Sequence, residues 1–212
     1  MKTRLDEFNL LIEIWSDVVC PWCYIGKRNL EVALAGFDGD IEIKHRAFQL
    51  DPRANATRSS FDALRERYGV TQVDAMLDRV SKIAAEAGLT FRLKETMTGN
   101  TLEAHRLLLW AQSRGDAQPL LAAMYKAYFE DAKPLFTASD LLAVAVSVGY
   151  QPDDVVALLG GDSFTNEVET DQAAAARLGA NGVPFFVIDG RYGISGAQPI
   201  ETFARALAKA TS

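Results

Sequence analysis

Hydrophobic residues cluster or alternate with polar ones in three short stretches of the chain. These are residues 11–15 (LIEIW), 41–48 (IEIKHRAF) and 182–188 (GVPFFVI). Runs of this length, alternating or continuously apolar, are typical of β-strands. Asp189-Gly190 follows the third stretch and is a strong signal for a two-residue hairpin. Residues 191–195 are therefore expected to pair back as a fourth strand.

Apolar positions three and four residues apart indicate helices elsewhere in the chain. The first helix is expected from about Pro21 to Ala35, with Gly36 ending it. A second is expected behind a Thr71 cap and ends at Gly88. Further helices are expected at 102–110, 119–129, 137–149, 152–159, 163–178 and 199–210.

The order of these elements predicts a fold of the α/β class. A strand, a helix long enough for a right-handed crossover and a second strand form a β-α-β unit. A helix, a hairpin and a closing helix form an α-β-β-α unit at the other end of the sequence. We therefore predict a thioredoxin-like domain in two parts, 10–58 and 160–212, with an inserted all-helical subdomain at 59–159. Residues 1–9 are expected to be a mobile, polar lead-in.

Composition and charge narrow the classes of partner. Of the 212 residues, 49% are hydrophobic, which is enough for a substantial core. The net charge of −6 and the pI of about 5.0 argue against nucleic acid as a partner. No apolar run approaches the length of a membrane span, and the first residues lack the apolar region of a secretory signal. We expect a cytoplasmic protein with no membrane partner.

Both cysteines of the chain lie in one motif, Cys20-Pro21-Trp22-Cys23, between the first predicted strand and the first predicted helix. A C-x-x-C motif at such a turn is typical of a thioredoxin-type redox site. Cys20 would lie at the helix N-terminus, where unpaired N–H groups and the helix dipole favour a negatively charged sulfur. Pro21 suits the first helical position, because the N–H that it lacks has no partner there. Cys23, one turn further on, is placed to attack a mixed disulfide on Cys20.

Two other uses of a cysteine pair fit the sequence less well. A zinc site needs four ligands, and the two histidines that remain, His45 and His105, lie far apart in the sequence. A structural disulfide closing so short a loop would add little stability. We therefore expect no metal and no bound cofactor.

Four blocks of sequence, in order, resemble the DsbA family and specifically its cytoplasmic FrnE-like branch. They are residues 17–28 (DVVCPWCYIGKR), 100–106 (NTLEAHR), 182–187 (GVPFFV) and 194–199 (ISGAQP). The resemblance covers most of the chain. It implies a thiol–disulfide oxidoreductase or isomerase that acts on protein or small-molecule disulfides. Cys20 would be its nucleophile, Cys23 its resolving cysteine, and glutathione a candidate redox partner.

The resemblance also assigns roles to residues around the motif. Pro184 matches the proline that the thioredoxin superfamily keeps in cis opposite the C-x-x-C, where a turn would direct the Val183 backbone toward the disulfide and an extended substrate. The alternative is a trans proline that begins an edge strand. Trp22 stands, without charge, where the extracytoplasmic DsbA branch has a histidine, so we expect a less oxidising disulfide. Asp17 would act in the same direction if it is ionised near the sulfur, and its alternative role is that of a surface acid at a helix N-terminus.

His105 lies on an apolar predicted helix. A lone histidine in that position is more often a core or rim residue than a catalyst. Because it belongs to one of the four blocks, we hypothesise that it faces the active site and assists proton transfer at Cys23. His45 is expected to be structural. The residues expected to line a substrate groove are Asn100, Thr101 and Tyr24.

Two other functions compete with dithiol–disulfide exchange. Glutathione-dependent isomerases and kappa-class glutathione transferases resemble this chain in layout, but they usually carry serine in place of the first cysteine and lack the second. Because this chain keeps both cysteines, its sequence favours redox chemistry. A non-catalytic chaperone that binds through the helical subdomain has less support. The sequence leaves the physiological substrate and the oligomeric state open.

Overall fold

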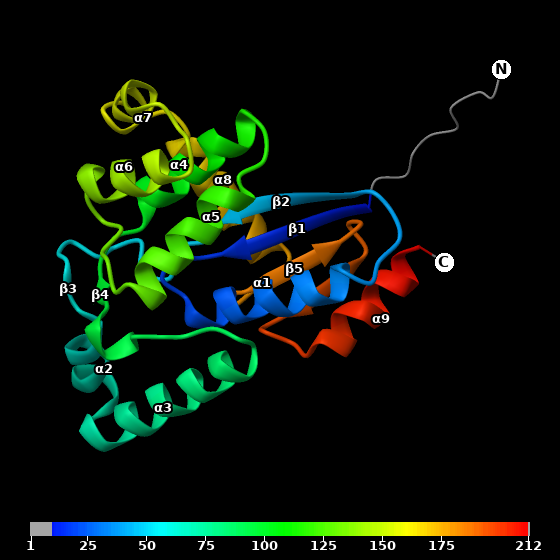
Figure 1. Ribbon diagram of the computed structural model, residues 1–212, viewed down its shortest axis with the longest axis horizontal. Helices are drawn as coiled ribbons and strands as arrows, with labels where there is room; N and C mark the ends of the chain where they lie inside the picture. The colour runs from blue at the N-terminus through cyan, green and yellow to red at the C-terminus, as the bar shows by residue number, and fades with distance from the viewer. Residues whose placement is uncertain (1–9, 212) are drawn as a thin grey trace.

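The structure, a computed structural model, describes residues 10–211. The predicted lead-in, residues 1–9, lies outside the described residues, as does residue 212. Four strands form a central sheet in the order β2-β1-β5-β6 (Figure 1). Their bounds are β1 Leu10–Ser16, β2 Ile41–Ala47, β5 Phe185–Ile188 and β6 Tyr192–Ser195.

The pairing of these strands follows from the connections between them. β1 and β2 are parallel, with Leu10 opposite Ile41, because the helix between them returns the chain to the same end of the sheet. β5 is antiparallel to β1, and β6 is antiparallel to β5. In the turn between β5 and β6, Asp189 and Gly190 have φ values of 53° and 63°. Positive φ at both positions and a hydrogen bond from the Arg191 N–H to the Ile188 carbonyl at 3.0 Å are typical of a type I′ turn. Ile188 pairs with Tyr192, however, so the loop has three residues, 189–191, where two were predicted.

Helices cover both faces of the sheet. On one face, α1 (Pro21–Leu34) packs against α9 (Ile200–Ala210). The buried core on that face includes Ile12, Leu30, Phe186 and Phe203. On the other face, α8 (Thr165–Arg177) packs against β2, and its Ala175 belongs to a small buried cluster with Trp15 and Val187. This is a thioredoxin-like fold, as the order of elements predicted.

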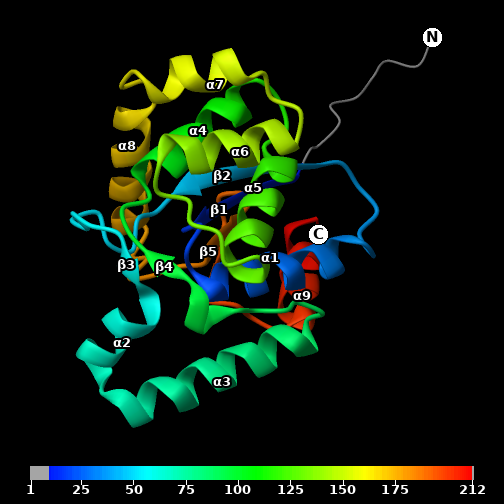
Figure 2. The same ribbon diagram turned by 60° about the vertical axis from the view of Figure 1, so that its left-hand side comes forward.

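The segment between β2 and α8 is helical except for a short two-stranded ribbon. Its elements are β3 Arg58–Ser59, α2 Ser60–Tyr68, α3 Val70–Glu86, the 3₁₀ helix η1 Leu93–Glu95, β4 Met97–Thr98, α4 Leu102–Ser113, α5 Gln118–Tyr125, the π-helix η2 Lys126–Glu130, α6 Ala138–Ser147 and α7 Pro152–Leu159. Figure 2 shows α2 and α3 set apart from the other helices, with α3 running beneath α1.

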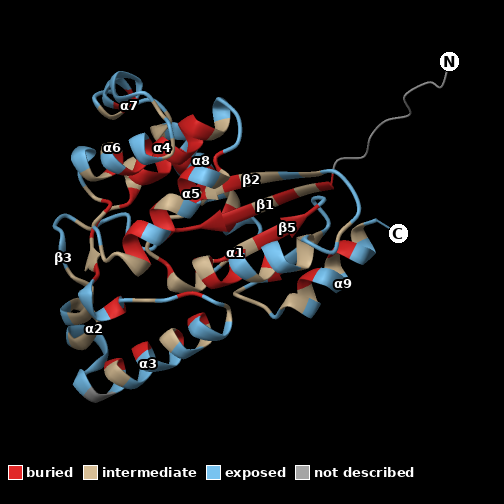
Figure 3. Ribbon diagram, in the orientation of Figure 1, coloured by how far each residue is buried: buried red, intermediate tan, exposed pale blue. Residues whose placement is uncertain are grey.

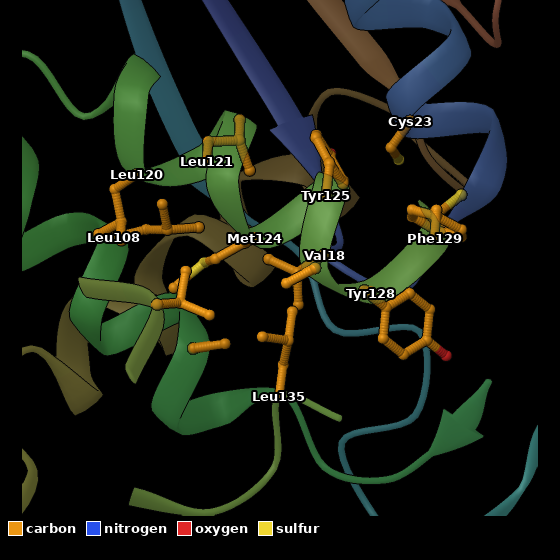
Figure 4. Close-up of a cluster of buried hydrophobic side chains, with 14 of the residues drawn as sticks. Val18, Cys23, Leu108, Leu120, Leu121, Met124, Tyr125, Tyr128, Phe129 and Leu135 are labelled. Carbon is orange, nitrogen blue, oxygen red and sulfur yellow. The ribbon is translucent and has the colours of Figure 1, made fainter. Parts of the chain in front are cut away.

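The largest hydrophobic core lies inside this inserted segment. Leu120, Leu121, Met124, Tyr125 and Phe129 of α5 and η2 are almost completely buried there (Figure 4). The same cluster of buried residues includes both cysteines. α2 has only half-buried and exposed residues, and α3 buries Val73, Leu77, Val80 and Ala84 in this cluster while it exposes most of its other residues (Figure 3). The insertion therefore forms part of the active-site wall.

Several elements differ from the prediction. α2 was not predicted, because its apolar stripe is short: Phe61, Leu64 and Tyr68 have helical spacing, but none of the α2 residues, all of which are described, is fully buried. The strands β3 and β4 have two residues each, too few to show alternation. α3 begins at Val70 with Gly69 in the N-cap position, whereas the side chain of Thr71, the predicted cap, lies outside the described residues. The domain boundaries after residues 58 and 159 stay a prediction.

Candidate active site

The cysteine motif occupies the turn between β1 and α1, as the sequence indicated. Cys20 is the N-cap residue of α1 with an extended backbone (φ −90°, ψ 112°), and Pro21 takes the first helical position. The Cys23 N–H donates to the Cys20 carbonyl at 3.0 Å, which closes the first turn of the helix. Both thiols are free, and only 4% of Cys20 and 2% of Cys23 is exposed.

The loop before β5 brings Val183 and Pro184 to the first sulfur. The Val183–Pro184 peptide bond is cis, as the resemblance implied. The Cys20 thiol donates to the Val183 carbonyl, with Sγ 3.6 Å from the oxygen. Gly26 allows α1 to approach this loop, since a Cβ there would come within 3.0 Å of the Pro184 ring. Residues 163 positions apart in the chain therefore meet at one sulfur.

The environment of Cys23 keeps its sulfur protonated. Burial is the main cause that raises the pKa of the Cys23 thiol well above its ordinary range. A hydrogen bond and charge from Cys20 raise this pKa further, and so does the carboxylate of Asp17, whereas the backbone of Asp17 lowers it. For Cys23 to become a nucleophile, its proton must therefore be accepted by another group.

Asp17 lies beneath the motif and is 1% exposed. Its Oδ2 accepts a hydrogen bond from the Leu50 N–H at 2.8 Å, and its Oδ1 lies 3.4 Å from Nε2 of His105. The interpretation of Asp17 as a surface acid is therefore wrong, because the loop after β2 folds over its carboxylate. His105, on α4, is 3% exposed and lies against Asp17. We therefore expect any effect of His105 on Cys23 to pass through this carboxylate.

Asp17→Asn tests the electrostatic effect of this buried carboxylate. Asparagine keeps the shape and can still accept from Leu50, but it removes a charge that raises the pKa of Cys23. We expect the pKa of Cys23 to fall. Release of substrate from a mixed disulfide on Cys20 should then become faster at neutral pH, by about three- to fourfold for each unit of the shift, because a less basic thiolate is more abundant but also less nucleophilic.

Single-turnover release followed from pH 6 to pH 10 measures this effect. Asp189→Asn, in the exposed β5–β6 turn, is the matched control. Slower release with an unchanged pH midpoint would contradict the prediction. That result would instead identify Asp17 as the group that accepts the Cys23 proton.

Tyr24 points into the insertion. Its ring stacks on Tyr125 of α5 with centroids 4.8 Å apart and on Phe91 at 5.7 Å. Its hydroxyl donates to Glu130 Oε1 at 2.9 Å, and burial is the main cause that raises its pKa. Figure 4 places Tyr125 beside Cys23. Tyr24 therefore joins α1 to the helical insertion, and Tyr125, which lies within the predicted helix 119–129, is next to the second cysteine.

Asn100 and Thr101 also have structural positions. The Asn100 side chain accepts from Gln49 Nε2 at 3.0 Å and from the Leu102 N–H at 2.9 Å, and its amide donates to the Pro52 carbonyl at 3.1 Å. It thereby fixes the loop after β2 to the start of α4. Thr101 is the N-cap residue of α4 and is 2% exposed.

A groove of about 1160 Å³ opens beside the motif. Pro21 and Trp22 contribute to its wall, together with the loop after β2, α2, α3 and the π-helix. Asn100, Thr101 and Tyr24 are not among the described residues that line it, and their assignment to a substrate groove stays a prediction. The polar atoms of Asn100 are engaged with the backbone, and the ring of Tyr24 with other aromatic rings.

Among residues 10–211, no group of three or more His, Cys, Asp or Glu side chains could hold a metal ion. No helix in the same range is long and apolar enough to cross a membrane.

Comparison with known proteins gives consistent results. The model of the DSBA-like thioredoxin domain matches residues 11–208. The chain is 41% identical to a probable DsbA oxidoreductase from Streptomyces coelicolor, with a TM-score of 0.90 over 96% of this chain and 90% of that one. No curated protein matched the chain.

Two more distant structures share the fold. One is the cytosolic disulfide reductase DsbM from Pseudomonas aeruginosa, solved with GSH (16% identity, TM-score 0.68, 95% of this chain and 100% of that one). The other is a 2-hydroxychromene-2-carboxylate isomerase (14% identity, TM-score 0.68, 94% of this chain and 95% of that one). At these identities the likeness concerns the fold alone.

Proposed function

Since the chain belongs to the DSBA-like thioredoxin domain family, we propose that it catalyses dithiol–disulfide exchange, with Cys20 as the nucleophile and Cys23 as the resolving cysteine. The observation that carries this proposal is the position of Cys20. Its sulfur lies at the N-terminus of α1, next to the Val183 carbonyl and one helical turn from a second thiol. A helix N-terminus stabilises a thiolate, and the second thiol gives the exchange a way to finish.

The proposed reaction consists of two exchanges. The Cys20 thiolate attacks a substrate disulfide, forms a mixed disulfide with one substrate sulfur and releases the other, which takes up a proton. Cys23 then loses its proton and attacks the Cys20 sulfur, which forms the Cys20–Cys23 disulfide and releases the remaining substrate thiol. The substrate gains two electrons and two protons, and the enzyme loses them. The reverse sequence oxidises a substrate dithiol.

We propose that the substrate docks on the backbone of Val183. The Val183 carbonyl lies 3.6 Å from the Cys20 sulfur, in the loop just before β5. An extended substrate segment paired with residue 183 would pass directly beside the nucleophile. Because such pairing uses main-chain groups, it tolerates many substrate sequences.

We include the FrnE-like branch, a cytoplasmic location and glutathione as a redox partner in this proposal. Glutathione is supported by the GSH-bound structure of DsbM, which has the same fold. The reduction potential of the cysteine pair, measured by thiol trapping across a glutathione series, defines the direction of the reaction. A value near about −270 mV is typical of a reductant, and one near about −120 to −180 mV of an oxidant or isomerase.

Cys23→Ala tests the proposal against the isomerase alternative. Without the resolving thiol, Cys20 should remain joined to its substrate, so mixed disulfides should accumulate and be released by a reducing agent. Cys20→Ala is the control and should form none. A glutathione-dependent isomerase, which has no need of Cys23, would instead keep its activity in Cys23→Ala and trap nothing. Loss of both cysteines without loss of substrate binding would favour a chaperone.

A further inference from the structure

The groove beside the motif has a distinct chemical character. Its floor is apolar and includes Leu64, Leu77, Val80, Leu93 and Phe129. Two large apolar side chains of its lining are open to solvent, Leu50 at 50% exposed and Met76 at 37%. A substrate that extends from the Cys20 turn past Trp22 would lie over these side chains.

The charged side chains in the lining are mainly cationic. Four arginines line the groove, Arg53, Arg58, Arg67 and Arg79, against three acids: the buried Asp17 and the exposed Asp51 and Glu66. Arg58 is paired with Glu66 at 2.5 Å. Among residues 10–211, the guanidinium groups of the other three arginines have no carboxylate partner. This concentration of positive charge is notable in a chain whose net charge is −6.

The size of the groove indicates what occupies it. At about 1160 Å³ it exceeds the usual range for small-molecule sites, about 300–1,000 Å³. An extended polypeptide advances about 3.3 Å per residue, so several residues of a bound segment would fit along such a groove. Its exposed apolar side chains would contact the apolar side chains of that segment. The guanidinium of Arg67 lies over the Tyr68 ring, with its carbon 5.2 Å from the ring centroid, which leaves its N–H groups able to donate. The three arginines without a carboxylate partner would bind carboxylates, for which guanidinium groups have matching geometry.

We propose that the groove binds an acidic segment of a disulfide-containing polypeptide substrate, with its carboxylates at Arg53, Arg67 and Arg79. This inference rests on the proposed function, because it places the segment next to a disulfide held at Cys20. Pairing with Val183 accepts many sequences, whereas the arginines would select among them by charge. Glutathione disulfide also carries carboxylates, so the experiment must separate it from a polypeptide.

Three synthetic peptides test the proposal. Each contains one internal disulfide and a four-residue flank of glutamate, glutamine or lysine, and glutathione disulfide serves as a fourth substrate. We expect wild-type kcat/KM to be highest for the glutamate peptide and at least about tenfold lower for the lysine peptide at low salt. The difference should shrink as salt screens the arginines.

Reversing the groove charge provides the decisive variant. In Arg67→Glu/Arg79→Glu, the preference for the glutamate peptide over the lysine peptide should be lost or inverted. The control, Arg205→Glu, makes the same kind of change on α9, which contributes nothing to the described lining of the groove, and should keep the wild-type preference. Retained secondary structure in all variants, measured by circular dichroism, shows that they are folded.

Other outcomes would overturn the proposal. Equal wild-type rates for the three peptides would show that the groove does not select by charge. A charge effect confined to glutathione disulfide would assign the arginines to that small ligand. An equal loss of preference in Arg205→Glu would show a general effect of net charge. If no substrate is exchanged by any of the proteins, the proposed function itself fails.

Discussion

Arg106→Met is expected to lower the free energy of unfolding by about 3–5 kcal/mol, the range found when one partner of a buried charged network is removed. Arg106, on α4, is 2% exposed. Its guanidinium donates to three carbonyls at the end of α7 and in the loop that follows: Leu158 at 2.9 Å, Gly161 at 2.6 Å and Ser163 at 2.8 Å. The carbonyls at a helix C-terminus have no partner within the helix, so this arginine caps α7 from outside.

The size of the effect follows from what methionine leaves behind. Methionine fills most of the volume but donates no hydrogen bond, and hydrogen bonds to a charged group contribute about 1.5–3 kcal/mol each. The Leu158 carbonyl still accepts from the Gly161 N–H at 3.2 Å, so the loss should stay below the sum of three such bonds. Chemical denaturation and thermal melting measure the loss, with a fall in Tm of roughly 10 °C expected for a chain of this length. Arg106→Lys keeps the charge but not the planar set of donors, so it should lose an intermediate amount.

A second arginine, at the C-terminal end of the same helix, provides the control. Arg114 is exposed and lies over the Trp110 ring, with its guanidinium carbon 4.4 Å from the ring centroid. Exposed contacts of this kind are worth about 0.5–1 kcal/mol, so Arg114→Met should change stability by no more than that. Equal losses in the two variants would show that the carbonyl contacts of Arg106 contribute no more stability than an exposed contact.

Local sequence determined the elements that were predicted well. The strand, the CPWC turn and α1 are adjacent in the chain, and the hairpin depends on two neighbouring residues, Asp189 and Gly190. The meeting of Cys20 with Val183 is a contact over 163 positions, and only the family resemblance indicated it. In physical terms, periodicity and turn chemistry act over a few residues, whereas the site is completed by tertiary packing.

The sequence is least informative about side chains whose role depends on distant backbone. Asn100 was expected to line a groove, and its amide both donates to and accepts from the loop after β2. For Asp17 the sequence left two roles open, a charge near the sulfur and a surface acid, and the hydrogen bond from the distant Leu50 N–H to its buried carboxylate excludes the second. Lys27 of α1 is likewise only 8% exposed and is paired with Glu31. The spacing of apolar and polar residues in the sequence does not indicate such hydrogen-bond or ion-pair partners.

Protonation of His45 is expected to lower the unfolding free energy of the protein in acid. This histidine of β2 is 4% exposed, and neither ring nitrogen has a hydrogen-bond partner within the described residues. Burial and then the positive charge of Lys27 lower the pKa of His45 from 6.5 to about 4, against smaller opposite effects of Gln118 and Asp116. A buried, structural position of His45 therefore makes the stability of the fold depend on pH.

The sign of the effect follows from linkage. Between pH 6.5 and about pH 4, the unfolded chain binds a proton at His45 that the folded protein does not bind. Stability contributed by the neutral ring is therefore present above pH 6.5 and falls with pH by about 1.4 kcal/mol per unit, to a total of about 3 kcal/mol. His45→Leu removes this titration, since leucine fills the buried site without a group that can be protonated.

Urea unfolding of wild type and His45→Leu, from pH 7.5 to pH 4.5, isolates the contribution of this one ring. All other titrating groups are common to both proteins, so the difference between their unfolding free energies reports His45 alone. We expect the unfolding free energy of the wild type to fall steadily, relative to that of His45→Leu, below pH 6.5. Two curves that stay parallel down to pH 4.5 would show that the folded protein protonates His45 as readily as the unfolded chain. In that case the pocket between β2 and Lys27 would have to open to water, and acid sensitivity would have to arise from the carboxylates instead.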